Sequence, residues 1–237
     1  MSTYLLAKHA YLCVADNHVV FLDLRRDQYS AIDPAEAPTL RNLVRGWPVG
    51  PDTLEVPPSQ ETLQQLLDDG LLTEDCEVGK DAAPVQLPEP RYELHSARVP
   101  LLRVAPRHYL NMTLAWLTVT YQLRYRPLEE TVLKAKRRSE LGRADFPFDP
   151  QRAAPLIAIY RTLQPRLFSP IDACLRNSLT LLQFLSRYGL FPTWTFGVRM
   201  EPPASNLLLA HSWLQQQSIV LNDTVHHIRQ YVPILAV

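Results

Sequence analysis

Proline is the feature that most restricts how this chain can fold: the sequence holds 21 prolines against 7 glycines in 237 residues. The proline ring fixes the backbone angle φ and removes an N–H donor, so proline interrupts helices and central strands. Many of the prolines gather in three short stretches, VPPS, PVQLPEP and MEPPAS. We therefore expect rigid connectors at these stretches, and look there for the boundary between folded parts.

The first part of the chain is predicted to begin with a small sheet. Residues 10–32 contain three β-rich runs, AYLCV, VVFLDL and YSAI, separated by the turn-forming sequences DNH and RRDQ. This pattern predicts a three-stranded meander. Helical spacing follows in AEAPTLRNLVRG and again in SQETLQQLLDDG. Three strands followed by short helices predict a winged-helix-like unit.

The second part is predicted to run helices first and strands last. Residues 77–99 are rich in proline and lack a sustained hydrophobic period, as in a semi-extended linker. We place the linker at residues 84–95, between a domain at residues 1–83 and a domain at residues 96–237. Beyond the linker, four helical patterns precede β-rich segments that are expected to form an antiparallel sheet. The helical patterns cover residues 107–125, 128–141, 151–167 and 169–188. The predicted fold class is therefore α+β.

Composition excludes several classes of protein. Lys and Arg together number 24, as do Asp and Glu, so a generally basic nucleic-acid binder is not expected. The N-terminus holds too short and polar an apolar run for a signal peptide, and no stretch approaches the roughly 18 apolar residues that span a bilayer. We therefore expect a soluble, cytoplasmic protein with no membrane and no nucleic-acid partner.

The cysteines and histidines support neither a disulfide framework nor a zinc site. The three cysteines, Cys13, Cys76 and Cys174, are odd in number and far apart in the sequence. The single adjacent histidine pair, His226 and His227, has no cysteine partners at zinc-site spacing. Free thiols, no metal ion and no cofactor are expected.

One cysteine stands at the predicted start of a helix. In SPIDACLRNS, Ser169 can cap the free amides, Pro170 fits the first helical position and Asp172 completes a capping-box-like pattern. Cys174 would then lie near the helix N-terminus, where unpaired N–H groups and the helix dipole favour a thiolate. The alternative is a small buried residue at the edge of the apolar stripe of this helix. That stripe consists of Leu175, Leu179, Leu182 and Leu185.

Downstream, AHSWLQQQSIVLND predicts a β-hairpin that offers partners for this thiol. His211 and Gln215 lie on one face of the first strand. If Gln215 pairs with Ile219 across a three-residue loop, His211 lies opposite Asp223, with Cβ atoms roughly 5 Å apart. A register shifted by one would place Asn222 opposite His211 instead. The loop sequence, QQS, lacks glycine.

These residue types suit nucleophilic catalysis. A carboxylate or amide beside an imidazole fixes the tautomer and orientation of the ring, which can then stabilise a thiolate and protonate a leaving amine. Papain-type enzymes use this arrangement of cysteine, histidine and aspartate. The alternative is that His211 is a satisfied strand histidine and that Asn222 and Asp223 serve only turn chemistry.

At these residues the chain resembles a known family. The segments ACLRNSLTLLQFLSRYGL, FGVRMEP, AHSWL and VLND resemble the transglutaminase-like cysteine peptidase domain of lasso-peptide B proteins, the leader peptidases of lasso-peptide biosynthesis. The N-terminal VVFLDLRRDQYSAID resembles the precursor-recognition element of such pathways, which has a winged-helix fold. The resemblance implies Cys174 as nucleophile, His211 as general base and acid, and Asp223 as the orienting residue. The glycine-free loop departs from the Asp-Gly or Asn-Gly type of turn that the family often has.

The resemblance also implies a peptide-binding role for the first part. In such recognition elements the leader adds as a strand to the edge of the sheet and packs against a helix, here residues 28–32 and 60–68. The candidate contacts are Tyr29, Ser30, Ala31, Ile32, Leu63, Leu66 and Leu67. Alternatively, Tyr29 and the leucines form the core of the small domain. DNA binding is a further alternative, but the second helix is rich in Gln, Asp and Glu, which suits phosphate contact poorly.

The function implied by the resemblance is leader removal in lasso-peptide biosynthesis. The protein would bind the leader of a ribosomally made precursor peptide and cut it from the core. The freed core would then pass to an ATP-dependent, asparagine-synthetase-like lasso cyclase, which closes the macrolactam. Two alternatives remain open: transfer of the acyl group to an amine, as in transglutaminases, and a non-catalytic peptide-binding adaptor.

Overall fold

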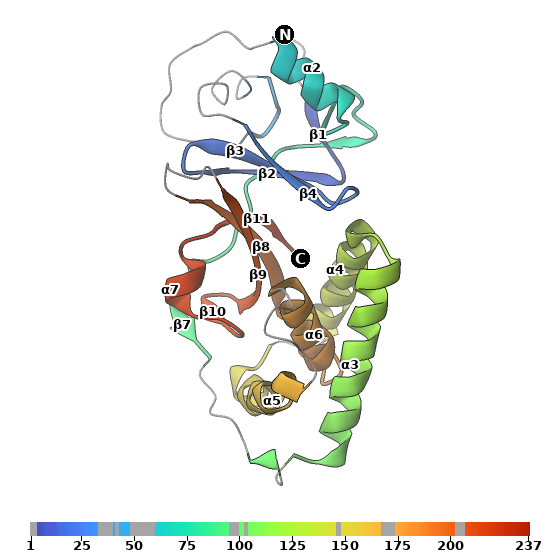
Figure 1. Cartoon of the computed structure of the whole chain (residues 1–237), viewed down its shortest axis with the longest axis vertical. Coiled ribbons are helices and arrows are strands. Elements are labelled where there is room, and N and C mark those ends of the chain that lie inside the picture. The colour runs from blue at the N-terminus through green and yellow to red at the C-terminus, as the bar shows by residue number, and fades with distance from the viewer. Residues whose placement is uncertain are drawn as a thin grey trace. The chain divides into compact units, whose positions relative to one another are not determined.

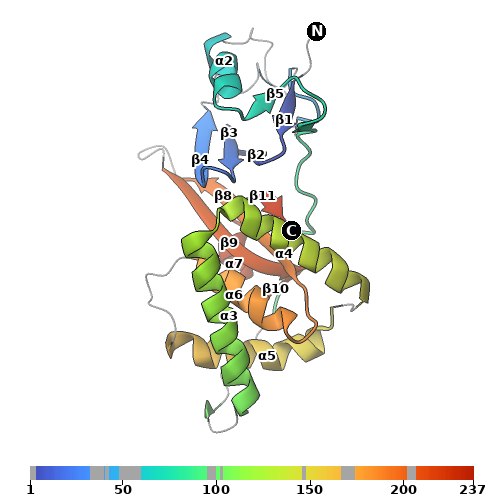
Figure 2. The same cartoon turned by 90° about the vertical axis from the view of Figure 1, so that its right-hand side faces the viewer.

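The computed structural model describes residues 4–32, 40, 43–47, 60–94, 100–101, 104–145, 148–166, 174–201 and 207–237 (Figures 1 and 2). The chain divides into two compact units. The first comprises Met1–Gln86, Gly197–Ala210 and Tyr231–Leu235, and the second comprises Leu87–Phe196, His211–Gln230 and Ala236–Val237. Within the described ranges, no helix is both long and apolar enough to cross a membrane.

The N-terminal meander forms as predicted. Strands β2 (Ala10–Ala15), β3 (His18–Asp23) and β4 (Gln28–Ile32) pair antiparallel in the order β2-β3-β4. The β2–β3 turn needs no glycine, because Asp16 and Asn17 adopt φ values of 49° and 66° and belong to residue types that tolerate the left-handed region. Among the described strands, β4 lies at an edge of this sheet and pairs with β3 alone.

A second small sheet and one helix complete the described N-terminal region. Strand β1 (Leu5–Ala7) lies between β5 (Leu72–Thr73) and β6 (Gly79–Lys80), and none of these three strands was predicted. Helix α2 (Gln60–Asp68) confirms the second predicted helix, whereas the first lies mostly outside the described residues. The winged-helix arrangement stays a prediction. The core of this region includes Leu6, Leu12, Val19, Phe21, Leu40, Val44, Leu66, Leu71 and Leu72.

The proline-rich segment is only partly a linker. Residues 81–91 have no regular structure, but Tyr92–Glu93 forms strand β7, which pairs parallel with strand β10 (Ile219–Val220). The expectation of a purely antiparallel C-terminal sheet is therefore wrong at this edge. Strand β7 is only two residues long, too short to leave a periodic signal in the sequence. The domain limits drawn around residues 84–95 stay a prediction.

The second unit runs helices first, as predicted. Helices α3 (Pro106–Tyr125), α4 (Leu128–Asp145), α5 (Pro150–Leu163) and α6 (Cys174–Ser186) follow one another along the chain. Helix α6 packs against α3 and α5, and all its residues from Ser178 onward are buried. The predicted leucine stripe is therefore buried from Leu179 on, and so are the polar side chains between the leucines. Helix α6 is thus a central helix, not an amphipathic surface helix.

A sheet completes a mixed α+β fold, and all its strands except β7 follow these helices in the chain. Its five strands lie in the order β11-β8-β9-β10-β7. The remaining elements are β8 (Thr193–Met200), β9 (Leu208–Gln216), β11 (Val232–Ala236) and the short helix α7 (Val225–Ile228). The order of helices followed by most of the sheet confirms the predicted α+β class for this part of the chain.

Helix α4 approaches Phe191 closely at a glycine. A methyl group on Gly142 would lie 2.2 Å from Cε2 of Phe191, much closer than two carbon atoms can approach. We expect Gly142→Ala to lower the free energy of unfolding by about 1–3 kcal/mol, because overpacking outweighs the ~1 kcal/mol that alanine gains in helix propensity. Chemical denaturation measures the change, and exposed Glu140→Ala is the control, with an expected effect within about 0.5 kcal/mol. Unchanged stability of Gly142→Ala would contradict this contact.

Candidate active site

Cys174 lies at the start of helix α6 and is half-buried. The backbone N–H groups of Leu175 and Ser212 donate hydrogen bonds to its sulfur. Leu175 belongs to α6 and Ser212 to β9, so the sulfur lies where the start of the helix meets this strand. The predicted capping sequence SPID lies outside the described residues.

The hairpin downstream forms, but not in the register that was predicted. Gln216 pairs with Ile219 and Gln215 with Val220, so the loop contains two residues and not three. A two-residue loop requires a residue in the left-handed region, and here Gln217 adopts it with φ of 50°. The predicted pairing of Gln215 with Ile219 is therefore wrong by one residue.

A buried glutamine side chain holds this glycine-free turn. The Nε2 of Gln215 donates to the carbonyl oxygen of Gln217 at 2.6 Å and to that of Pro88 at 2.7 Å. Its Oε1 accepts from Nε1 of Trp213 at 3.1 Å. Gln215 is fully buried and satisfied at both ends of its amide. These bonds offset the cost of placing Gln217 in the left-handed region.

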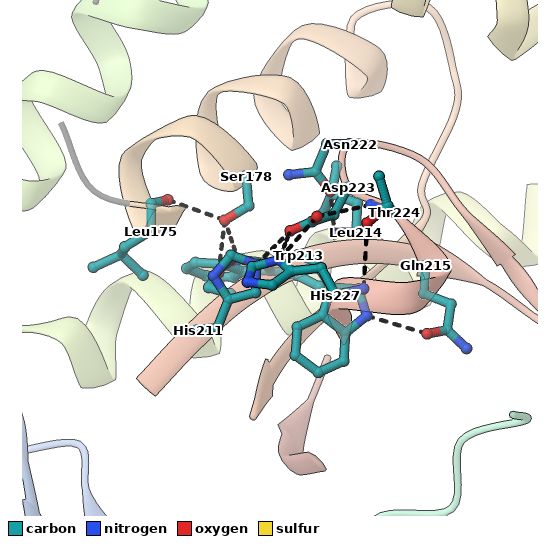
Figure 3. Close-up of polar contacts among 12 residues, drawn as sticks. Leu175, Ser178, His211, Trp213, Leu214, Gln215, Asn222, Asp223, Thr224 and His227 are labelled. Carbon is teal, nitrogen blue, oxygen red and sulfur yellow. Dashed lines mark hydrogen bonds and ion pairs between the residues drawn. The ribbon is translucent and has the colours of Figure 1, made fainter. Parts of the chain in front are cut away.

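Asp223 reaches His211 although the two residues are not paired in the strand ladder. Strand β10 ends at Val220, and after it one more backbone bond joins the strands, from the N–H of Leu221 to the carbonyl oxygen of Leu214 at 3.0 Å. The N–H of Leu214 then donates to Oδ1 of Asn222 at 2.8 Å, in place of a backbone carbonyl. Beyond this point Oδ2 of Asp223 lies 2.5 Å from Nε2 of His211 (Figure 3). The predicted contact between His211 and Asp223 therefore forms, but the two residues are not cross-strand neighbours. Asp223 reaches His211 because the chain leaves the β9–β10 pairing before Asp223.

A second histidine, which was not predicted, binds the same carboxylate. Nδ1 of His227 lies 3.0 Å from both oxygens of Asp223, and its ring meets the His211 ring edge to face. Thr224 caps helix α7 by accepting from the backbone N–H of His227, which places this side chain beside the carboxylate. The sequence did contain a signal for this contact, because His227 follows Asp223 by four positions, a spacing that places both side chains on one side of a helical turn.

His211 also hydrogen-bonds the thiol of Cys174. Since Nε2 faces Asp223, Nδ1 is the nitrogen left for the sulfur. Trp213 stacks on the His211 ring, with the planes 16° apart and the ring centroids 6.0 Å apart, and so restricts rotation of the imidazole. A continuous hydrogen-bonded chain therefore runs from Asp223 through His211 to Cys174.

These contacts shift the pKa of all three groups. Burial would raise the thiol pKa of Cys174, but the hydrogen bond and charge of His211 and the two backbone N–H groups lower it below its ordinary value. Burial would lower the pKa of His211, but Asp223 and Cys174 raise it to about 9. The carboxyl pKa of Asp223 falls because the hydrogen bonds it accepts outweigh its burial. The site therefore favours a thiolate beside an imidazolium, the charge state of a nucleophilic cysteine.

The other two cysteines lie in different surroundings. Cys13 is buried in β2, and burial raises its thiol pKa to about 12. A thiol of this kind stays protonated and unreactive at neutral pH. Cys76 is exposed. The predicted nucleophile, Cys174, is the cysteine whose pKa is lowered by a neighbouring imidazole.

His211, Asp223 and His227 also form a group that could hold a metal ion, since one ligand atom of each lies within 4.8 Å of the others. Two imidazoles and a carboxylate suit zinc. However, Nε2 of His211 and Nδ1 of His227 are already engaged in hydrogen bonds with Asp223, at 2.5 Å and 3.0 Å. We therefore assign this cluster to hydrogen bonding, and the expectation of no metal ion stays a prediction.

The predicted leader-binding residues lie on β4 and α2 in the first unit. Ser30 and Ala31 are exposed, and Tyr29 is half-buried. Ile32, Leu63 and Leu67 are half-buried and pack against the core of this region. Leu66 is 5% exposed and belongs to that core, so its side chain offers little surface to a peptide. The role of these residues in leader binding stays a prediction.

Comparison with known proteins finds one matching family. The model of the transglutaminase-like superfamily matches residues 115–236, a range that includes Cys174, His211 and Asp223. No curated protein and no solved structure matches the chain. Because the match covers more than half of the 237 residues, the chain belongs to the transglutaminase-like superfamily.

Proposed function

We propose that this protein is a cysteine peptidase that binds the leader of a ribosomally made precursor peptide and cuts it from the core peptide. The observation that carries the proposal is the hydrogen-bonded chain from Asp223 through His211 to Cys174, together with the lowered pKa of the thiol. The transglutaminase-like superfamily includes cysteine proteases, which agrees with this chemistry.

In the proposed reaction the thiolate of Cys174 attacks the carbonyl carbon of the bond between leader and core. The C–S bond forms, the C–N bond breaks, and the His211 imidazolium gives its proton to the leaving amine of the core. Asp223 holds the imidazole in the required tautomer and stabilises its positive charge. His211 then takes a proton from water, which attacks the thioester. The leader leaves as a carboxylic acid, and the thiolate and imidazolium are restored.

The tetrahedral intermediate of this reaction carries a negatively charged oxygen that needs hydrogen-bond donors. We assign the backbone N–H of Cys174 to this role, because it lies at the start of helix α6. The positive end of the helix dipole favours an anion at that place.

Recognition of the leader is assigned to the first unit, acting as a winged-helix-like recognition element. Strand β4 is an edge strand, and in the part of the chain that the structure describes no strand pairs with its outer side. An extended leader could add there, using backbone hydrogen bonds for affinity and alternate side chains for selectivity. Exposed Ser30 and Ala31 and half-buried Tyr29 support this assignment.

The resemblance to lasso-peptide B proteins suggests when this cleavage occurs. The core amine freed by the peptidase would be the group that an ATP-dependent, asparagine-synthetase-like cyclase joins into a macrolactam. The test is mass spectrometry of the short precursor encoded beside the gene, after incubation with this protein, with and without the cyclase. A free leader carboxylate supports hydrolysis, whereas an isopeptide-linked product would show acyl transfer instead.

Replacing the nucleophile should stop cleavage without preventing leader binding. We expect Cys174→Ala to lower the cleavage rate at least about a thousandfold, because no thiol remains to form the thioester. Leader affinity, measured by fluorescence polarisation, should not change. Exposed Cys76→Ala is the matched control and should cut the precursor at the wild-type rate. Cleavage by Cys174→Ala at the wild-type rate would reject Cys174 as the nucleophile. A wild-type protein that binds the leader but cuts no precursor would support the adaptor alternative.

The charge state of the site predicts that the rate of peptide cleavage and the rate of Cys174 alkylation respond differently to alkaline pH. The lowered thiol pKa of Cys174 should make alkylation by iodoacetamide fast already at neutral pH. His211 has a pKa of about 9, and above that pH it has no proton for the leaving amine. Peptide cleavage should therefore fall as pH rises through about 9, while alkylation stays fast. An alkylation rate that climbs about tenfold per pH unit up to pH ~9, like that of an ordinary thiol, would rule out this ion pair.

Leader binding at the edge of the N-terminal sheet can be tested on β4 itself. We expect Tyr29→Ala to weaken leader affinity about tenfold, because a half-buried aromatic side chain is a typical anchor of a bound peptide. Exposed Gln28→Ala, one residue earlier on the same strand, is the control and should change affinity less than about twofold. Fluorescence polarisation with a labelled leader peptide measures both. Equal affinities for Tyr29→Ala and wild type would remove Tyr29 from the binding surface.

A further inference from the structure

One helical turn after Cys174, buried polar groups from three elements form a hydrogen-bond network. The hydroxyl oxygens of Ser178 in α6 and Ser212 in β9 lie 2.6 Å apart. Nε1 of Trp194 in β8 lies 2.8 Å from the Ser212 oxygen and 3.0 Å from the Ser178 oxygen. The Ser178 hydroxyl also donates to the carbonyl oxygen of Leu175 at 3.1 Å (Figure 3). Ser178 and Trp194 are 0% exposed and Ser212 is 2% exposed, so water is excluded from these bonds.

The donors and acceptors of this network can be paired in one consistent order, which runs from Trp194 to the carbonyl of Leu175. Trp194 has one N–H and no acceptor, each serine has one O–H, and the carbonyl of Leu175 can only accept. If Ser178 donates to Leu175, Ser212 must donate to Ser178 and accept from Trp194. Each polar hydrogen then has one good acceptor, and this arrangement requires one relative placement of α6, β9 and β8.

We propose that Ser178, Ser212 and Trp194, here named the serine–tryptophan network, position the nucleophile against its histidine. Ser212 directly follows His211 in β9, and its backbone N–H donates to the sulfur of Cys174. The network therefore fixes the strand segment that carries both the imidazole and one donor to the thiolate.

The helix side of the network is fixed in the same way. Leu175, whose carbonyl accepts from Ser178, directly follows Cys174, and its own N–H donates to the sulfur. Leu175 and Ser178 thus lie within about one helical turn of Cys174, and Ser212 lies beside His211. The inference rests on the proposed function for the role of Cys174. It adds that the reactivity of the thiol depends on side chains that do not touch substrate.

Packing alone does not explain hydroxyl groups at this place. Alanine would fill a buried contact between a helix and a strand nearly as well as serine, and would bring no polar atom to satisfy. Buried hydroxyls are unfavourable unless they are paired, so a network that spans three elements stabilises one placement over slightly shifted ones. A shift between α6 and β9 would lengthen the contact of Cys174 with His211, on which thiolate formation depends.

The test compares serine variants by the reactivity of one thiol. The full chain is treated with iodoacetamide at a fixed pH of ~7, where an ordinary thiol is mostly protonated, and the alkylation rate at Cys174 is followed by peptide mass spectrometry. Ser178→Ala and Ser212→Ala remove the network hydroxyls. Ser186→Ala is the matched control: Ser186 is a buried serine of the same helix, and its hydroxyl donates to Gln183 within that helix at 2.9 Å. Thermal melting reports the stability of each variant.

We expect Ser178→Ala and Ser212→Ala each to slow alkylation of Cys174 about tenfold, and Ser186→Ala to change it less than about twofold at a similar loss of melting temperature. Ser212→Thr keeps the hydroxyl on a residue type that suits a strand, and should recover most of the rate. Equal rates in wild type and both network variants, or an equal loss in Ser186→Ala, would overturn the inference. If Ser178→Ala fails to fold, Trp194→Phe removes the N–H donor while keeping an aromatic ring and takes its place in the comparison.

Alkylation needs no peptide, so the inference and the proposed function can fail separately. A thiol that depends on the network in a protein that cuts no precursor would reject only the peptidase proposal. A protein that cuts its precursor, but whose thiol is indifferent to the network, would reject only the positioning role.

Discussion

The hydrogen bond between His211 and Asp223 is the interaction on which the rest of the site depends. Burial disfavours a thiolate and an imidazolium when each is alone, and the two become stable together only while their contact is maintained. Asp223 raises the pKa of the imidazole, and the charged imidazole in turn lowers that of Cys174. The surrounding structure therefore has to keep α6, β9 and the segment after β10 in fixed places. Trp213, Asn222 and His227 each hold one part of this arrangement.

The chemistry of the site is visible in the amino-acid sequence, because it depends on residue type and order. A thiol at a helix start, a histidine in a strand and an aspartate after the next strand made Cys174, His211 and Asp223 the candidates, and the family resemblance then implied the role of each. Long periodic segments such as α3 and α6 are equally predictable, since their apolar spacing extends over several turns. The meander at residues 10–32 is predictable from its turn sequences.

The geometry that joins these residues is not visible in the sequence, because it depends on contacts between distant parts of the chain. The loop was predicted one residue too long, since no glycine or asparagine marks a left-handed position there. The buried amide of Gln215 bonds Gln217 in that position, and Gln215 is held in turn by Pro88, more than a hundred residues earlier. Strand β7 and the serine–tryptophan network could not be predicted from the sequence for the same reason. A two-residue strand and single buried serines have no periodic signal, and their roles appear only once the elements are packed.

Under the proposed function, the two units divide the work between binding and chemistry. A leader held at β4 would raise the local concentration of the scissile bond at Cys174, so the peptidase would need few contacts of its own with the core peptide. The central claim is that Cys174 forms a covalent bond to the leader during cleavage. Intact-protein mass spectrometry after acid quenching of the reaction with the precursor tests it most directly. The account predicts a transient adduct of the leader mass less water on Cys174, released by hydroxylamine. Cleavage at the full rate by a protein whose Cys174 has been completely alkylated would contradict it.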